Sequence, residues 1–126
     1  MDKVQAFNTF WSSFGLPAYD ENTVPDGEHA PKFPYLTYSV SVAEFDNQVP
    51  INVSLWYRSS TWKDAENKMR ELEQAIPARG GAHIPFTNGV VWFMRGSPFY
   101  QHMNDDSDEL IKRIYINVTA EFFTAE

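Results

Sequence analysis

The chain has 126 residues, of which 43% are hydrophobic and 16% aromatic, and its 10 Lys and Arg against 17 Asp and Glu give a formal net charge of −7. This composition is typical of one globular domain with a substantial core and excludes an intrinsically disordered chain. Cysteine is absent, which excludes disulfides, thiolate metal ligands and cysteine nucleophiles, and the acidic balance argues against a nucleic-acid-binding protein.

The first predicted element is an amphipathic helix close to the N-terminus. Asp2 followed three residues later by Gln5 makes a capping-box pattern at its start, and Gly15 and Pro17 end it. Its apolar side chains recur at helical spacing on one face: Val4, Phe7, Phe10, Trp11 and Phe14. Residues 16–32 have prolines, a glycine and four acidic side chains without an apolar period, which predicts a long acidic loop.

Two alternating segments follow and predict an antiparallel hairpin. Residues 35–42 have one apolar face, formed by Leu36, Tyr38, Val40 and Val42. Residues 51–58 direct one set of side chains inward and the other outward: Ile51, Val53, Leu55 and Tyr57, against Asn52, Ser54, Trp56 and Arg58. The polar residues 46–48 predict the turn between the two strands.

A second amphipathic helix has the clearest pattern in the chain. Thr61 and Asp64 have the spacing of a capping box, with Asp in place of Glu or Gln, and Pro77 ends the helix. Its apolar residues are three or four positions apart and predict a face packed on the sheet: Trp62, Ala65, Met69, Leu72 and Ile76.

The remaining residues predict a second hairpin. Asn88-Gly89 lies between two apolar runs and predicts a tight turn. Residues 96–109 contain Pro98 and an acidic run, which predicts a second loop. Residues 110–123 alternate as the final strand.

The predicted order is helix, hairpin, helix, hairpin, in a single domain that spans residues 1–126. It implies an α+β fold with a four-stranded, mainly antiparallel sheet and both helices packed on one face. The other face would carry Tyr35, Trp56 and Tyr115, and a small open sheet also has unprotected edges. We therefore expect a second copy or another protein to cover that face.

No pattern of catalytic or metal-binding residues emerges. The three histidines lie in different predicted loops or turns without metal-ligand spacing. Residues 104–109 resemble a calcium-binding loop only in composition, because its glycine and distal glutamate are missing. A nucleophile elbow and a phosphate-binding loop are also missing. We expect no catalytic residues, no cofactor and no metal, and hence a protein that is not an enzyme.

Aromatic residues and arginines near the predicted strand ends and in the second loop have the composition enriched at protein interfaces. They predict an interface with another copy or a partner: Tyr35, Trp56, Arg58, Trp92, Arg95, Phe99, Tyr100 and Arg113. Ordinary packing within the domain is the alternative for the same side chains.

Three stretches of the chain resemble the tail terminator (tail completion) proteins of long-tailed bacteriophages and related prophage elements. They are Pro31-Lys32-Phe33-Pro34-Tyr35-Leu36-Thr37-Tyr38, then Arg95-Gly96-Ser97-Pro98-Phe99-Tyr100-Gln101, and Asp105-Asp106-Ser107-Asp108 leading to Lys112-Arg113-Ile114-Tyr115-Ile116-Asn117-Val118. With the order of the elements, the resemblance spans most of the chain, and none of the three stretches is a catalytic signature.

The resemblance implies an α/β fold whose subunits form a hexameric ring at the head-proximal end of the tail tube. Such a ring ends tube polymerisation and presents a surface to head-completion or neck proteins. It implies a virion protein of the tail or neck, assembled in the bacterial cytoplasm, with no membrane partner. Six copies would carry six times −7, or −42 charges, so that DNA passes without specific binding. We expect Asp105, Asp106 and Asp108 to form an acidic loop that lines the lumen.

Two other interpretations stay open. One is a different phage neck or minor capsid protein of similar size and acidity. The other is a small α+β ligand-binding or enzymatic domain, in which Trp56, Trp92 and Tyr115 would line a pocket under the sheet.

Overall fold

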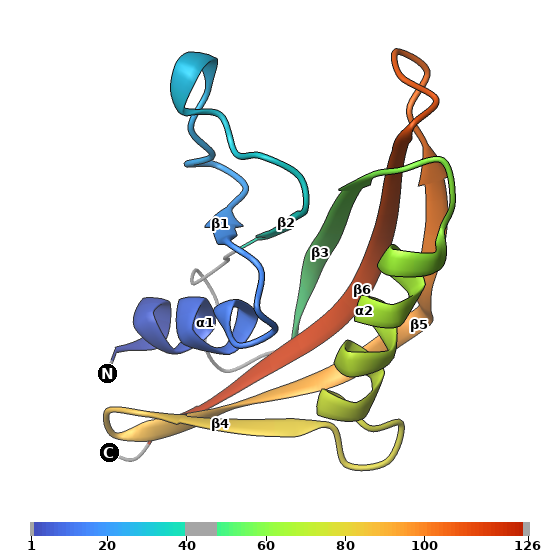
Figure 1. The fold of residues 1–126 in the computed structure, drawn as a ribbon. Coiled ribbons are helices and arrows are strands. Elements are labelled where there is room, and N and C mark those ends of the chain that lie inside the picture. Colours follow the sequence, from blue (N-terminus) through green and yellow to red (C-terminus); the bar gives the residue numbers. More distant parts are fainter. Residues whose placement is uncertain (1, 40–47, 125–126) are drawn as a thin grey trace.

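A computed structural model describes residues 2–39 and 48–124 of the chain (Figure 1). The predicted positions Val40 and Val42, and most of the predicted turn at 46–48, lie outside these residues. The described part is an α+β fold with these elements: α1 (Lys3–Ser12), β1 (Ala18–Asp20), the 3-10 turn η1 (Gly27–His29), β2 (Tyr35–Tyr38), β3 (Val49–Arg58), α2 (Lys63–Ala75), β4 (Ala82–Phe86), β5 (Gly89–Asn104) and β6 (Ile111–Thr124).

The strands form one mixed sheet in the order β1-β2-β3-β6-β5-β4. β1 and β2 are parallel, and the other neighbouring strands are antiparallel. The prediction of four strands is therefore wrong, because the described residues form six. β1 lies within the predicted acidic loop, where three residues are too few to show an alternating pattern. The Asn88-Gly89 turn joins β4 to β5 as predicted, and β6 is a further strand beside them.

The predicted loop at residues 96–109 is also wrong over most of its length. β5 continues through it to Asn104 and pairs with β6 on both sides of an irregularity between Arg95 and Tyr100. Gly96 and Pro98, which suggested a loop, lie within this irregularity. A Cβ on Gly96 would approach the Cβ of Asn117 to 2.8 Å, so the close approach of β5 to β6 at this irregularity requires a glycine there. Only residues 105–110 remain as the turn between the two strands.

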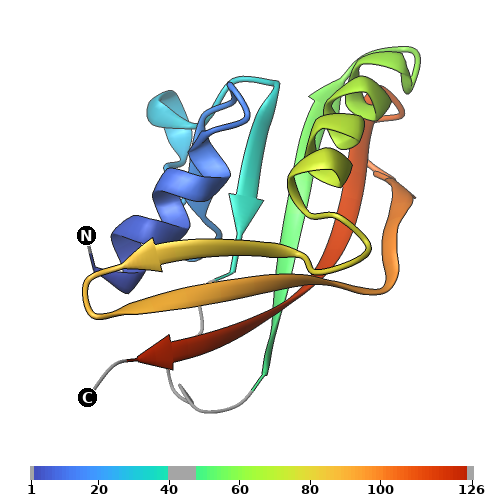
Figure 2. The same cartoon turned by 90° about the horizontal axis from the view of Figure 1, so that it is seen from below.

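Both helices pack on the same face of the sheet, as predicted (Figure 2). Alternate residues of β3 and β6 supply the sheet side of the core, among them Ile51, Val53, Leu55, Ile114, Ile116 and Val118. The sheet curls so far that α1 contacts β1 and β4, the strands at its two edges. The edge strands thus close around α1, and the uncovered face is the opposite, outer one.

The helix starts differ in how well the sequence predicted them. The capping box of α1 forms, since the Asp2 carboxylate accepts from the Gln5 N–H and the Gln5 side chain accepts from the Asp2 N–H. Val4 is 54% exposed and does not join the buried face of α1. At α2 the predicted Thr61–Asp64 box does not form, because the N-cap is Trp62 and makes no side-chain capping bond.

Within residues 2–39 and 48–124, no helix combines the length and the apolar character needed to cross a membrane.

Candidate functional site

The uncovered face of the sheet carries a row of aromatic side chains that ends on an arginine. Cross-strand register places Tyr35 of β2 opposite Trp56 of β3, and Trp56 opposite Arg113 of β6. Tyr19 of β1 and Tyr115 of β6 extend the row at its two ends. We call these five residues the aromatic–arginine ladder. Because side chains alternate along a strand, the same strands bury their other residues under the helices.

Ring contacts connect the ladder from one edge strand to β6. The rings of Tyr19 and Tyr35 have centroids 6.2 Å apart, and those of Tyr35 and Trp56 stack at 6.0 Å with an angle of 13°. The guanidinium carbon of Arg113 lies 4.5 Å from the Trp56 ring centroid and 5.2 Å from that of Tyr115. Both distances are within the range of cation–π attraction.

Two hydrogen bonds from the ladder to buried hydroxyls fix its central side chains. The indole N–H of Trp56 donates to Thr37 Oγ1 at 2.9 Å, and Nε of Arg113 donates to Ser54 Oγ at 3.1 Å. Thr37 and Ser54 are themselves buried. The indole and the guanidinium are therefore held in place before any partner arrives, which lowers the entropy cost of binding.

Arg113 contributes a positive charge that no described carboxylate neutralises within ion-pair distance. The positive charge of Arg113 acts on the pKa of the neighbouring Tyr35 phenol. Burial raises the pKa of Tyr35, and the Arg113 cation acts in the opposite direction. The ladder thus combines apolar rings with one fixed cation. The chain as a whole, in contrast, has more carboxylates than basic side chains.

The structure brings together Tyr35, Trp56 and Arg113 of the eight predicted interface residues. Trp92 shares their face by register but lies farther along the sheet, opposite Glu121 of β6. Its ring stacks on His83 of β4 at 5.3 Å, and its indole N–H donates to Gly80 O at 2.6 Å. The uncovered face therefore carries a second, separate aromatic group.

Three other predicted residues pack on the helix side of the sheet. Arg95 donates from Nε to Ile76 O at 2.7 Å and from a terminal nitrogen to Glu73 O at 2.8 Å, which caps the C-terminus of α2. Its guanidinium also lies 4.5 Å from the Phe99 ring centroid. Phe99 and Tyr100 pack against the core. For these residues the contacts correspond to the alternative of ordinary packing.

Residues 105–110, which we call the acidic turn, lie at the end of the β5–β6 hairpin. Asp105 accepts from the Oγ and the N–H of Ser107, and these bonds lower the pKa of its carboxyl. Asp108 accepts from the Leu110 N–H and from Arg58 Nε at 3.0 Å, which lowers its pKa as well. Asp106 is exposed. The last of the eight predicted interface residues, Arg58 at the end of β3, is therefore engaged by the acidic turn of its own chain.

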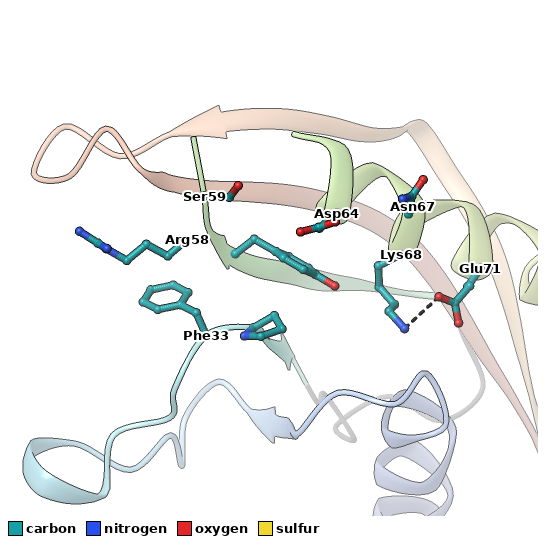
Figure 3. Close-up of a pocket in the computed structure, with 9 residues that line it drawn as sticks. Phe33, Arg58, Ser59, Asp64, Asn67, Lys68 and Glu71 are labelled. Atoms are coloured by element: carbon teal, nitrogen blue, oxygen red, sulfur yellow. Dashed lines mark ion pairs between the residues drawn. The ribbon is translucent and has the colours of Figure 1, made fainter. Parts of the chain in front are cut away.

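A polar cavity of about 400 Å³ lies between α2 and the residues that lead into β2 (Figure 3). Tyr57 lines it, and burial together with Asp64 and Glu71 raises the pKa of this phenol to about 12. Lys68 Nζ donates to Phe14 O at 2.6 Å and pairs with Glu71 at 2.9 Å. At neutral pH the phenol is a proton donor rather than a base, and the Lys68 amine is engaged by a carbonyl and a carboxylate, so neither is a ready nucleophile.

Two further features are a groove that Tyr19 of the ladder helps to line and a histidine on the helix side of the sheet. A groove of about 570 Å³ separates α1 from β1, and polar residues of both elements line it. On the helix side of β5, His102 stacks on Trp62 at 3.8 Å and contacts the Glu66 carboxylate. Among the residues that the structure describes, no group of three or more His, Cys, Asp or Glu side chains could hold a metal ion.

The sequence did not indicate Tyr19, Thr37 or Ser54 as parts of the site. Tyr19 lies in a segment expected to be a loop, and only its pairing with β2 brings it to the ladder. Thr37 and Ser54 occupy outward positions of two correctly predicted strands, next to Tyr35 and Trp56. That alternation was the one signal that could have placed both hydroxyls beside the ladder.

Comparison with known proteins gives no match: no protein-family model matches the chain, and neither does any curated protein.

Proposed function

We propose that the chain is a tail terminator of a long-tailed bacteriophage, a structural protein without enzymatic activity. Six copies form a ring at the head-proximal end of the tail tube. The ring stops tube polymerisation and joins the tail to a head-completion or neck protein. Its place is the tail or neck of the virion, after assembly in the cytoplasm of the bacterial host.

The observation that carries this proposal is the ladder on the uncovered sheet face. Fixed aromatic rings with an unneutralised arginine have the composition of interface hot spots. The resemblance to tail terminators involves the same surface. Its first stretch contributes Tyr35, and its third contributes Arg113 and Tyr115. Residues from two of the three stretches behind the resemblance thus meet on the face that a subunit contact would use, whereas the second stretch packs on the helix side.

The charge of the chain supports the passage of DNA through such a ring. Six copies carry six times −7, or −42 formal charges. A surface of one sign repels the phosphate backbone, and clustered lysines and arginines that would hold DNA by counterion release are few here. We therefore propose that DNA moves through the ring without specific binding, and that the other partners are proteins.

The ladder also favours the ring over a ligand-binding domain. That alternative needs Trp56, Trp92 and Tyr115 to line a pocket under the sheet. The structure places Trp56 and Tyr115 in the ladder on the uncovered face, and neither of the two cavities described above includes any of the three. A different neck or minor capsid protein would use the same face, and binding to the tail tube separates it from a terminator.

Termination of tube growth is the test. We expect the purified protein, added to the polymerising tail tube protein of the same phage, to give shorter tubes with extra density at one end in negative-stain electron micrographs. Tube protein alone is the control and should give longer tubes without such density. Tubes of unchanged length with bare ends would contradict the terminator function and favour a neck protein.

A further inference from the structure

We propose that the ladder of one copy binds the acidic turn of a second copy, with the Asp106 carboxylate on the Arg113 guanidinium. This inference rests on the proposed function, because it names the contact that closes the ring. It goes beyond that function in assigning both sides of the contact to particular residues.

The fixed orientation of Arg113 leaves its terminal nitrogens available to a carboxylate. Its Nε is occupied by Ser54, and the rings of Trp56 and Tyr115 hold the guanidinium plane. Among residues 2–39 and 48–124, no carboxylate forms an ion pair with it. A guanidinium presents a planar pair of N–H donors that matches the two oxygens of a carboxylate. The aromatic rings around it would exclude water and strengthen the pair.

Arg113 is half-buried, which makes an unpaired state unfavourable. Partial removal of water from a cation costs free energy that cation–π contacts offset only in part. A carboxylate from outside the chain would supply the missing counter-charge. Because the chain has 17 acidic residues against 10 basic ones, a second copy can supply such a carboxylate, and the complementarity is local to Arg113.

The acidic turn is the segment of the second copy best suited to reach the ladder. It projects from the body at the end of β5 and β6, the longest strands of the described sheet (Figure 1). Asp105 and Asp108 are held by Ser107 and Arg58, and they fix the turn around the exposed Asp106. A carboxylate on a rigid hairpin binds with a small loss of conformational entropy. The residues around η1 are also acidic, but only a three-residue 3-10 turn orders their tip.

Contact between the turn and the ladder joins two different surfaces of the subunit. An interface of this kind is heterologous, and it generates a closed ring when the rotation between neighbours permits closure. The acidic turn then lies between subunits. We therefore assign it to the subunit contact in place of the lumen expected from the sequence.

Reversal of charge on each side tests the contact. We expect Arg113→Glu and Asp106→Lys each to abolish the species of six times 14.5 kDa, 87 kDa, in light scattering and to leave monomer. An equimolar mixture of the two variants should restore it. In the mixture every turn meets a ladder of opposite charge, which gives a ring of alternating copies.

Asp26→Lys is the matched control, because it makes the same charge change on the other acidic segment, next to η1. We expect this variant to assemble like the unmodified chain. Asp106 is exposed, so its replacement tests the contact even if Arg113→Glu fails to fold, which circular dichroism would reveal.

Three results would overturn the inference. Rings that persist in both reversed variants, or a mixture that stays monomeric with both variants folded, would refute the contact and leave the proposed function intact. An unmodified chain that stays monomeric at every concentration would contradict the contact and the proposed ring together.

Discussion

Replacing Phe93 by alanine is expected to lower the free energy of unfolding by about 3–5 kcal/mol. Phe93 is completely buried at the centre of the contact between α1 and the sheet. Its ring centroid lies 5.2 Å from that of Phe7, 5.0 Å from that of Phe10 and 5.3 Å from the ring of Trp11. Truncation would remove these contacts and leave a cavity that close-packed neighbours fill only in part.

Urea unfolding followed by circular dichroism measures this loss. Phe123→Ala is the matched control, because Phe123 is 46% exposed near the end of the adjacent strand β6. Its free energy of unfolding should change by about 0.5 kcal/mol. Equal losses at the two positions would show that Phe93 is not central to the core.

Replacing Arg95 by alanine is expected to lower the free energy of unfolding by about 2–3 kcal/mol, the range of charge-assisted hydrogen bonds. Arg95 donates to two carbonyl oxygens at the end of α2, those of Glu73 and Ile76, and its guanidinium packs on the Phe99 ring. Alanine would leave these carbonyls without their cap and remove a cation from the negative end of the helix.

Two other variants separate the geometry of Arg95 from its charge. Arg95→Lys keeps the cation but lacks the planar fork that reaches both carbonyls, so we expect a smaller loss than for alanine. Arg79→Ala removes an exposed arginine from the nearby turn and should change the free energy of unfolding by about 0.5 kcal/mol. Thermal or urea unfolding of the three variants compares them. A loss at position 79 as large as that at position 95 would contradict the capping role.

The elements that the sequence predicted well are those with a long periodic pattern. Both helices have apolar faces of several turns, and the buried positions of β3 and β6 alternate over most of their length. β1 was missed because three residues carry no period, and its place depends on pairing with β2. β5 was cut short at Gly96 and Pro98, which lie in an irregularity between Arg95 and Tyr100, but the strand resumes its pairing with β6 at Tyr100.

The residues of the candidate site also divide into those that the sequence placed correctly and those that it did not. Tyr35, Trp56 and Arg113 share a face because the alternation of their strands is regular. Arg95, Phe99 and Tyr100 were placed in a loop, and the continuation of β5 turns them toward α2 and the core. A local sequence pattern cannot report such a contact with a distant helix. The uncovered face with Tyr35, Trp56 and Tyr115 was thus predictable, whereas the place of Tyr19 in the ladder required the structure.

Solution mass tests the ring most directly. Light scattering of the purified chain over a concentration series should show a discrete species of six times 14.5 kDa, 87 kDa. Its share should rise with concentration as subunits associate. A mass of 14.5 kDa at every concentration would contradict the ring.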